Sequence, residues 1–202
     1  MKRTRIYAML AAALVFLSAC GVNAIPTAEE NAKARWADVE NLYQRRLDLL
    51  PNLAAIARAN GQQELAVQIG VAEARARGAA AQVGPDQLTN PAAVRRFDEA
   101  QRGVSDLLAQ GLRINVVNEA TPQVRNVELM RDLLSQVEGT DNRIAVARRD
   151  YNAAVQAYNT EIRTFPSVIG ARIIYGSQPM TPFEAQEGAE RAPQMDLGNY
   201  SR

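Results

Sequence analysis

Apolar residues recur along most of this chain at steps of three and four, with polar residues between them. An α-helix turns once every 3.6 residues, so this spacing places the apolar positions on one helical face. The pattern is most regular between Pro122 and Pro166, where two sets of positions each repeat every seven residues. The first set is Met130, Val137, Ile144, Tyr151, Tyr158 and Phe165, and the second is Val127, Leu134, Asp141, Arg148, Val155 and Ile162. This double repeat predicts one long helix whose seam packs against other helices, and Pro166 is expected to end it.

A first helical segment is predicted to begin at Thr27. Thr27 and Glu30 have the spacing of a capping box, in which each side chain satisfies a free backbone N–H at the start of a helix. Pro51 is expected to kink this helix or end it locally, because proline donates no backbone hydrogen bond and disfavours α geometry at Leu50. The apolar face consists of Trp36, Val39, Tyr43, Leu50, Leu53 and Ala57.

Two further helical segments are predicted before the long one. The first runs from Gln62 to about Gln82, and small residues on one side permit close approach of a neighbouring helix. That side is Leu65, Ile69, Ala72, Ala76 and Ala79. The next begins with Asn90 as its N-cap and Pro91 in its first turn. Its apolar face is Phe97, Ala100, Val104, Leu107 and Ile114.

Glycine and proline are frequent after residue 166, which predicts an irregular tail over residues 167–202 with a disordered last part. One apolar patch in the tail is expected to fold back on the helices. It comprises Val168, Ile169, Ile173, Ile174 and Tyr175. Residues 27–166 are therefore expected to form one all-α domain, a helical bundle.

The first twenty residues resemble a bacterial lipoprotein signal. A basic start is followed by an apolar run from Ile6, which leads to Leu17-Ser18-Ala19-Cys20. As a helix the run reaches about 21 Å, short of the ~30 Å hydrocarbon core, so cleavage is favoured over a permanent span. We expect residues 1–19 to be removed, Cys20 to be acylated, and residues 20–26 to form a tether.

Cys20 is then a membrane anchor, since several acyl chains hold a protein stably in a bilayer. Gly21 follows the cysteine, which by resemblance to proteobacterial lipoproteins indicates the outer membrane and a protein that faces the periplasm. The alternative is a plain secretory signal in which the cysteine is incidental.

Composition argues against several classes of function. The formal net charge is +1, and it becomes −2 without the leader cations Lys2, Arg3 and Arg5, so no field for nucleic acid remains. The chain contains no histidine and one cysteine, Cys20, which excludes Ser-His-Asp and Cys-His catalysis. We therefore expect no enzymatic activity, no cofactor and no metal.

Two charged residues, Asp141 and Arg148, occupy seam positions that should face a core. If the first and last helices are antiparallel, counting along both places Arg46 near Asp141, and Arg148 near Glu40 or Asp38. Such ion pairs contribute little net stability but can fix the register of repetitive helices. The alternative is that both side chains reach water at the edge of the seam.

Two other uses of these charges are conceivable. Arg45, Arg46, Arg148 and Arg149 could bind an anion, or Asp141 could act with Glu138 or Asp48 as a catalytic carboxylate pair. A solvated helix face explains both groups more simply, because charged residues spaced along a helix usually face water.

Several stretches resemble the LemA family. They are Tyr43 to Leu53 (YQRRLDLLPNL), Glu138 to Arg148 (EGTDNRIAVAR), Tyr151-Asn152, Tyr158-Asn159 and Phe165-Pro166. The resemblance spans residues from about 30 to 185 and implies an antiparallel up-and-down four-helix bundle. Many members keep an N-terminal membrane helix, whereas this chain carries the cysteine signal. The resemblance implies no enzymatic reaction.

We therefore expect a lipid-anchored scaffold or interaction module of the cell envelope. Its partners would be the membrane, through acylated Cys20, and other envelope proteins, with no nucleic acid. The alternative is a carrier that binds a small amphiphile or lipid, using the Ala-lined groove of residues 65–79 and the apolar tail patch. A carboxylate-dependent hydrolase is a weaker third candidate.

Overall fold

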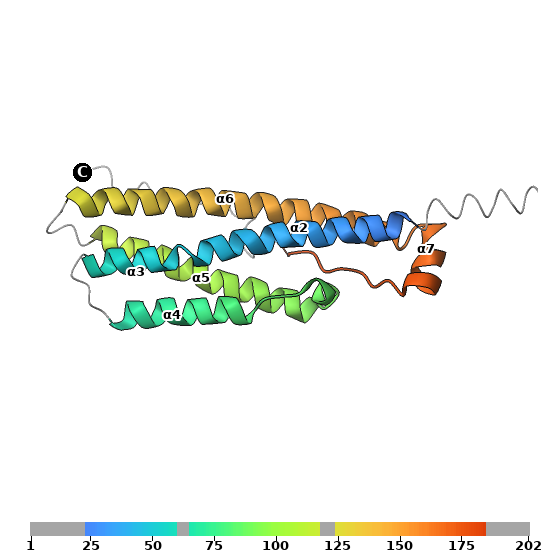
Figure 1. Cartoon of the computed structure of the whole chain (residues 1–202), viewed down its shortest axis with the longest axis horizontal. Coiled ribbons are helices and arrows are strands. Elements are labelled where there is room, and N and C mark those ends of the chain that lie inside the picture. The colour runs from blue at the N-terminus through green and yellow to red at the C-terminus, as the bar shows by residue number, and fades with distance from the viewer. Residues whose placement is uncertain (1–22, 60–64, 118–123, 185–202) are drawn as a thin grey trace, which may run out of the picture.

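The computed structural model describes residues 23–59, 65–117 and 124–184 (Figure 1). The elements in this part are α2 (Ala24–Leu47), α3 (Leu50–Ala59), α4 (Leu65–Ala80), the 3-10 turn η1 (Pro85–Gln87), α5 (Pro91–Val117), α6 (Val124–Glu161), α7 (Ser167–Gly170) and the π-helical turn η2 (Ala171–Tyr175). The predicted all-α class is confirmed, and the described residues include no strand.

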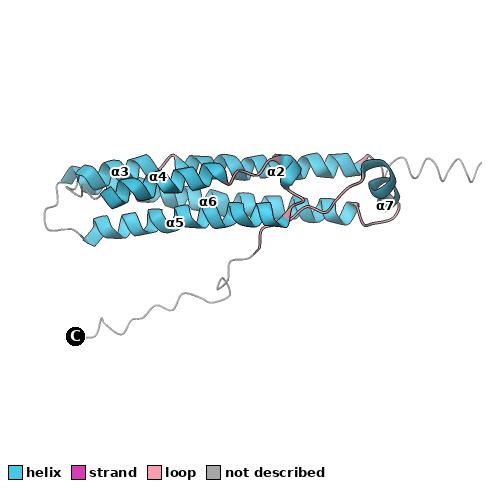
Figure 2. Ribbon diagram, turned by 90° about the horizontal axis from the view of Figure 1, so that it is seen from below, coloured by secondary structure: helices cyan, strands magenta, loops and turns pink. Residues whose placement is uncertain are grey.

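The long helices lie side by side along a common axis, with α2 and α3 following one another along α6 (Figures 1 and 2). Helices α2 and α6 run in opposite directions, because Trp36 meets Tyr151 while Arg46, further along α2, meets the earlier residue Asp141. Helix α5 packs against α4 and α3, and the buried apolar side chains form two clusters, one around Trp36 and one around Leu50. Within the described residues, no helix is both long and apolar enough to span a bilayer.

Asp48 and Leu49 form a turn between α2 and α3, in which the Leu49 N–H donates to the Arg46 carbonyl, and α3 begins at Leu50, directly before Pro51. Pro51 has no N–H to donate to the carbonyl of Leu47, so the hydrogen-bond ladder of α2 cannot continue through it. Helices α2 and α3 are therefore separate elements, and the apolar side chains around the break remain buried.

The helix ends differ from the predicted ones in two places. Helix α2 begins at Ala24, and the hydroxyl of Thr27 donates to the Asn23 carbonyl at 2.9 Å, so Thr27 lies inside the helix and the predicted capping box is wrong. Helix α6 ends at Glu161, before Pro166. The predicted cap at Asn90 is confirmed, since its Oδ1 accepts from the Ala92 N–H at 3.0 Å.

The predicted small-residue face of α4 is wrong by about one position. Ala72, Ala76 and Ala79 are exposed, whereas Val71, Ala74 and Gly78 are buried. A Cβ at Gly78 would lie 2.9 Å from a methyl group of Leu47, so glycine is what allows α4 to approach the end of α2 this closely. The reason for the error is that an Ala-rich helix has little contrast between its faces.

The centre of the core is a cluster of aromatic rings drawn from four segments. The ring of Trp36 on α2 lies 5.0 Å from Phe97 on α5, 5.2 Å from Tyr151 on α6 and 5.5 Å from Phe183 in the tail, between centroids. Trp36 also donates its indole N–H to the carbonyl of Val83 at 2.9 Å, so its one polar group is satisfied. This cluster fixes α2, α5, α6 and the tail to one another.

The tail folds back on the bundle, but not through the predicted patch. Ile173 and Ile174 are 79% and 64% exposed, and Phe165, predicted to lie on the seam, is 75% exposed. The chain instead returns along α6 after Gly176, and Phe183 enters the aromatic cluster. Disorder was predicted for the last part of the tail, and residues 185–202 lie outside the described part.

We predict that Phe183 contributes to the stability of the whole fold. Phe183→Ala should lower the free energy of unfolding by about 3–5 kcal/mol, because it empties a ring-sized space in the core. Phe165→Ala is the matched control and should change it by no more than about 0.5 kcal/mol, since Phe165 is exposed. Urea unfolding of the full chain measures both, and equal losses would contradict a core role for the tail.

Candidate functional site

Charged side chains gather in one cleft between α2, α5, α6 and the end of the tail. The cleft has a volume of about 720 Å³. The charged residues that line it are Arg46, Asp98, Arg102, Asp141, Arg148, Arg149 and Glu184. We call it the charged cleft.

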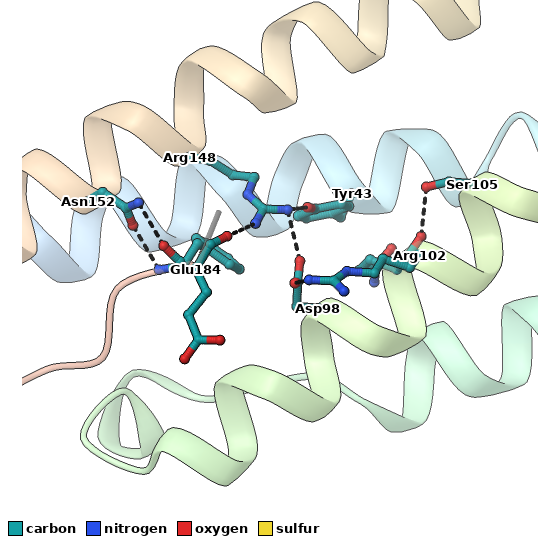
Figure 3. Close-up of polar contacts among 9 residues, drawn as sticks. Tyr43, Asp98, Arg102, Ser105, Arg148, Asn152 and Glu184 are labelled. Carbon is teal, nitrogen blue, oxygen red and sulfur yellow. Dashed lines mark hydrogen bonds and ion pairs between the residues drawn. The ribbon is translucent and has the colours of Figure 1, made fainter. Parts of the chain in front are cut away.

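Asp98 lies at the centre of the charged cleft with its side chain only 9% exposed (Figure 3). Its Oδ1 accepts from Arg148 Nη1 at 2.8 Å, and its Oδ2 accepts from Arg102 Nη2 at 2.6 Å. A buried carboxylate needs such partners, because desolvation of an unpaired charge is costly. Two guanidinium groups therefore hold one carboxylate.

Arg148 also contacts α2 and the tail. Its Nη1 donates to the hydroxyl of Tyr43 at 3.2 Å, and its Nη2 donates to the carbonyl of Glu184 at 3.4 Å (Figure 3). The guanidinium carbon lies 4.3 Å from the centroid of the Phe183 ring, a cation–π contact. Burial raises the pKa of Tyr43, and the neighbouring Arg148 opposes this rise.

The predicted partners of Arg148 are wrong. The structure pairs Arg148 with Asp98 of α5, whereas Asp38 lies 3.5 Å from Arg35 on its own helix and Glu40 is half-buried, with its pKa raised by burial. Counting along two antiparallel helices gives the height of a residue on the axis. The count does not say which third helix faces that residue, so it could not identify Asp98 on α5 as the partner of Arg148.

The structure brings the other predicted pair together. Arg46 Nη2 lies 2.8 Å from Asp141 Oδ1, with the two side chains 10% and 44% exposed. Burial raises the pKa of Asp141 and Arg46 opposes this rise, so desolvation outweighs attraction between the pair. A role in setting register, rather than in stability, stays a prediction for this pair.

Two asparagines on α6 bind the backbone of the tail. Asn152 donates Nδ2–H to the Phe183 carbonyl at 3.0 Å and accepts the Phe183 N–H on Oδ1 at 2.8 Å (Figure 3). Asn159 makes the same two bonds to Met180, at 2.8 Å and 2.9 Å. Each side-chain amide thus satisfies both peptide groups of one tail residue, as a neighbouring strand would.

The tyrosine before each asparagine adds a third bond. The hydroxyl of Tyr151 donates to the Thr181 carbonyl at 2.9 Å, and that of Tyr158 donates to the Gln178 carbonyl at 3.1 Å. The sequence signal for this arrangement was the repeated Tyr-Asn dipeptide, seven residues apart. It marks a helix face that binds an extended segment, which sequence reasoning did not infer.

The chain matches the LemA family over residues 35–197. It belongs to the LemA family. Two similar proteins are "Magnetosome protein MamQ 2" and "Magnetosome protein MamQ 1" of Paramagnetospirillum magneticum (strain ATCC 700264 / AMB-1), each 26% identical over 157 residues. The match covers 71% of this chain and 58% of the length of each relative.

The four arginines considered as an anion site do not form one unit in this LemA protein. Arg46 and Arg148 are paired with carboxylates, Arg149 is exposed at the charged cleft, and Arg45 is exposed outside it. The carboxylates considered as catalytic partners of Asp141, Glu138 and Asp48, are both exposed and do not line the charged cleft, and Asp141 is paired with Arg46. Cys20 lies outside the described residues.

A double-mutant cycle tests whether Arg46 and Asp141 are coupled. Removing both to alanine should cost less than the sum of the single losses, with a coupling of about 0.5–1 kcal/mol, the lower part of the usual range because Asp141 is partly exposed. The Glu73–Arg77 pair, also 2.8 Å apart but exposed, is the control and should couple by about 0.3–0.5 kcal/mol. Strictly additive losses for Arg46 and Asp141 would refute coupling.

Hydrogen exchange tests the tail clamp. Asn152→Ala should speed exchange of the Phe183 amide roughly tenfold or more. Leaving a buried donor such as the Phe183 N–H without its acceptor costs about 1–3 kcal/mol, and this lowers the free energy of local opening. Asn142→Ala, an exposed asparagine on the same helix, is the control and should leave the Phe183 amide unchanged. An unchanged rate in Asn152→Ala would mean that other contacts hold the tail.

Proposed function

We propose that this protein is a lipid-anchored scaffold or interaction module of the cell envelope. Its helices form an antiparallel four-helix bundle attached to the membrane through acylated Cys20, and the charged cleft receives a partner protein. In a Gram-negative cell the bundle would face the periplasm from the outer membrane. We propose no reaction for it.

The observation that carries this proposal is the pairing of charges in the charged cleft. Asp98 is held between Arg102 and Arg148, and Asp141 by Arg46, so these groups are committed to the fold. Arg149 and Glu184, exposed at the rim, remain available to a partner. Rim charges of this kind steer association and select partners.

The two relatives support a role in an assembly. Both are named for the magnetosome rather than for a reaction. The carrier alternative loses one of its two supports, because Ala72, Ala76 and Ala79 are exposed and do not line an apolar interior.

The first test is crosslinking and affinity purification of the full chain from membranes, followed by mass spectrometry of proteins, lipids and the N-terminus. We expect a chain that begins at acylated Cys20 and captures envelope proteins. Arg149→Glu should reduce the captured protein roughly threefold or more, because it reverses a charge at the cleft rim. Arg96→Glu, an exposed arginine of α5, is the matched control.

The outcomes separate the alternatives. Stoichiometric lipid with no captured protein would favour the carrier. Equal capture by Arg149→Glu and Arg96→Glu would mean that the charged cleft is not the interface. An unmodified Cys20, or a retained leader, would refute the lipid anchor.

A further inference from the structure

Large apolar side chains are exposed together at one end of the bundle. They lie on α7, η2 and the turn before them: Phe165, Ile169, Ile173, Ile174 and Tyr175, which are 75%, 52%, 79%, 64% and 43% exposed. We call this group the end patch. An exposed apolar group of this size on a soluble surface generally marks a binding surface.

The end patch belongs to an amphipathic segment. Ser167, Gly170 and Ala171 are buried against the bundle, whereas Ile169 and Ile173, four residues apart, point outward. The buried side holds the segment on the core, because Ala171 belongs to the same apolar cluster as Ile25. The apolar side chains of the end patch are therefore exposed on a segment that is itself packed against the core.

The end patch lies at the end of the bundle where the described chain begins. Helices α2 and α6 are antiparallel, so the start of α2 lies beside the end of α6, and Ile25 and Ile162 share one core cluster. Figures 1 and 2 both place α7 beside the start of α2. Asn23 follows Cys20 by three residues, which span at most about 11 Å. A lipid on Cys20 thus holds this end of the bundle at the bilayer.

Positive charge next to the end patch favours contact of the patch with a lipid bilayer. Arg163 precedes it and Arg172 lies within it, and both are exposed. Basic residues beside isoleucine, phenylalanine and tyrosine suit the boundary between acyl chains and anionic headgroups, where tyrosine also places its hydroxyl in water. Of the acidic groups at this end of α2 and α6, Glu29 and Glu30 are both paired with Lys33, and Glu161 accepts a hydrogen bond from Ser167.

We propose that the end patch inserts into the headgroup region of the bilayer and forms a second membrane contact beside the Cys20 anchor. This inference rests on the proposed function, because the anchor is what brings the end patch to the lipid. Two membrane contacts at one end would orient the long axis of the bundle away from the membrane surface. Arg148 and Asp141 would then lie about 20 and 30 Å along the axis from Glu161 at the end of α6, which holds the charged cleft away from the bilayer.

Tryptophan quenching tests the proposal on the full chain in vesicles of phosphatidylethanolamine and phosphatidylglycerol with bromine atoms near the headgroup end of the acyl chains. Trp36, the single tryptophan of the chain, is fully buried and gives a constant background. Ile173→Trp should lose roughly twofold or more fluorescence relative to Val146→Trp, because interfacial segments bury their apolar face by about 5–10 Å. Val146 is an exposed apolar residue of α6, about 22 Å along the axis from Glu161 at the end of that helix.

Flotation of the vesicles, with Cys20→Ser in parallel, separates the two proposals. If the chain floats but Ile173→Trp is quenched no more than Val146→Trp, the end patch does not insert, while the anchor stands.

If Ile173→Trp emission is shifted to the blue even without vesicles, protein covers the end patch, either a second copy or residues 185–202, and the inference is overturned. If Cys20→Ser floats and is still quenched at residue 173, the end patch inserts without the anchor, and the dependence on the proposed function is refuted. If no variant floats, both proposals fall.

Discussion

The guanidinium of Arg148 is the point at which four segments of the chain meet. It extends from α6 and contacts the carboxylate of Asp98 on α5, the hydroxyl of Tyr43 on α2 and the ring of Phe183 in the tail. A charge this deeply buried is tolerated only while its partners are present. A shift of α5 by one helical turn, about 5.4 Å, would separate Arg148 from Asp98 and leave Arg148 without its carboxylate, while Asp98 would keep Arg102 of its own helix. The alternative alignments of these repetitive helices therefore carry an electrostatic cost as well as a packing cost.

The tail depends on the same region for a different reason. An extended segment beside a helix finds no backbone ladder, because the peptide groups of the helix are already bonded to one another. The Tyr-Asn dipeptides of α6 supply the missing donors and acceptors from side chains, which allows Phe183 to enter the core without stranding its own peptide groups. The same contacts place Glu184 at the rim of the charged cleft.

This arrangement divides the polar chemistry of the molecule into two kinds. Paired groups inside the charged cleft, such as Asp98 and Arg148, join α5 to α6. Charged groups at the rim, such as the exposed side chains of Arg149 and Glu184, make no such link between helices in the described part of the chain. A protein whose free chemistry is confined to its surfaces fits the role of an interaction module that we propose.

Sequence by itself determined the helices, the interruption before Pro51, the cap at Asn90 and the core positions of Trp36 and Tyr151. These features depend on local periodicity and on the backbone chemistry of single residues, which the sequence displays directly. Counting along antiparallel helices was also enough to bring Arg46 to the level of Asp141. Only the tertiary structure decided that Arg148 pairs with Asp98, that Phe183 is a core residue and that Ile173 is exposed. Each of these depends on how the helices are rotated about their axes and on which distant segments meet. The sequence does not determine the rotation, because the faces of Ala-rich helices differ little in hydrophobicity. It does not determine where the tail packs, because the apolar runs of the tail are short.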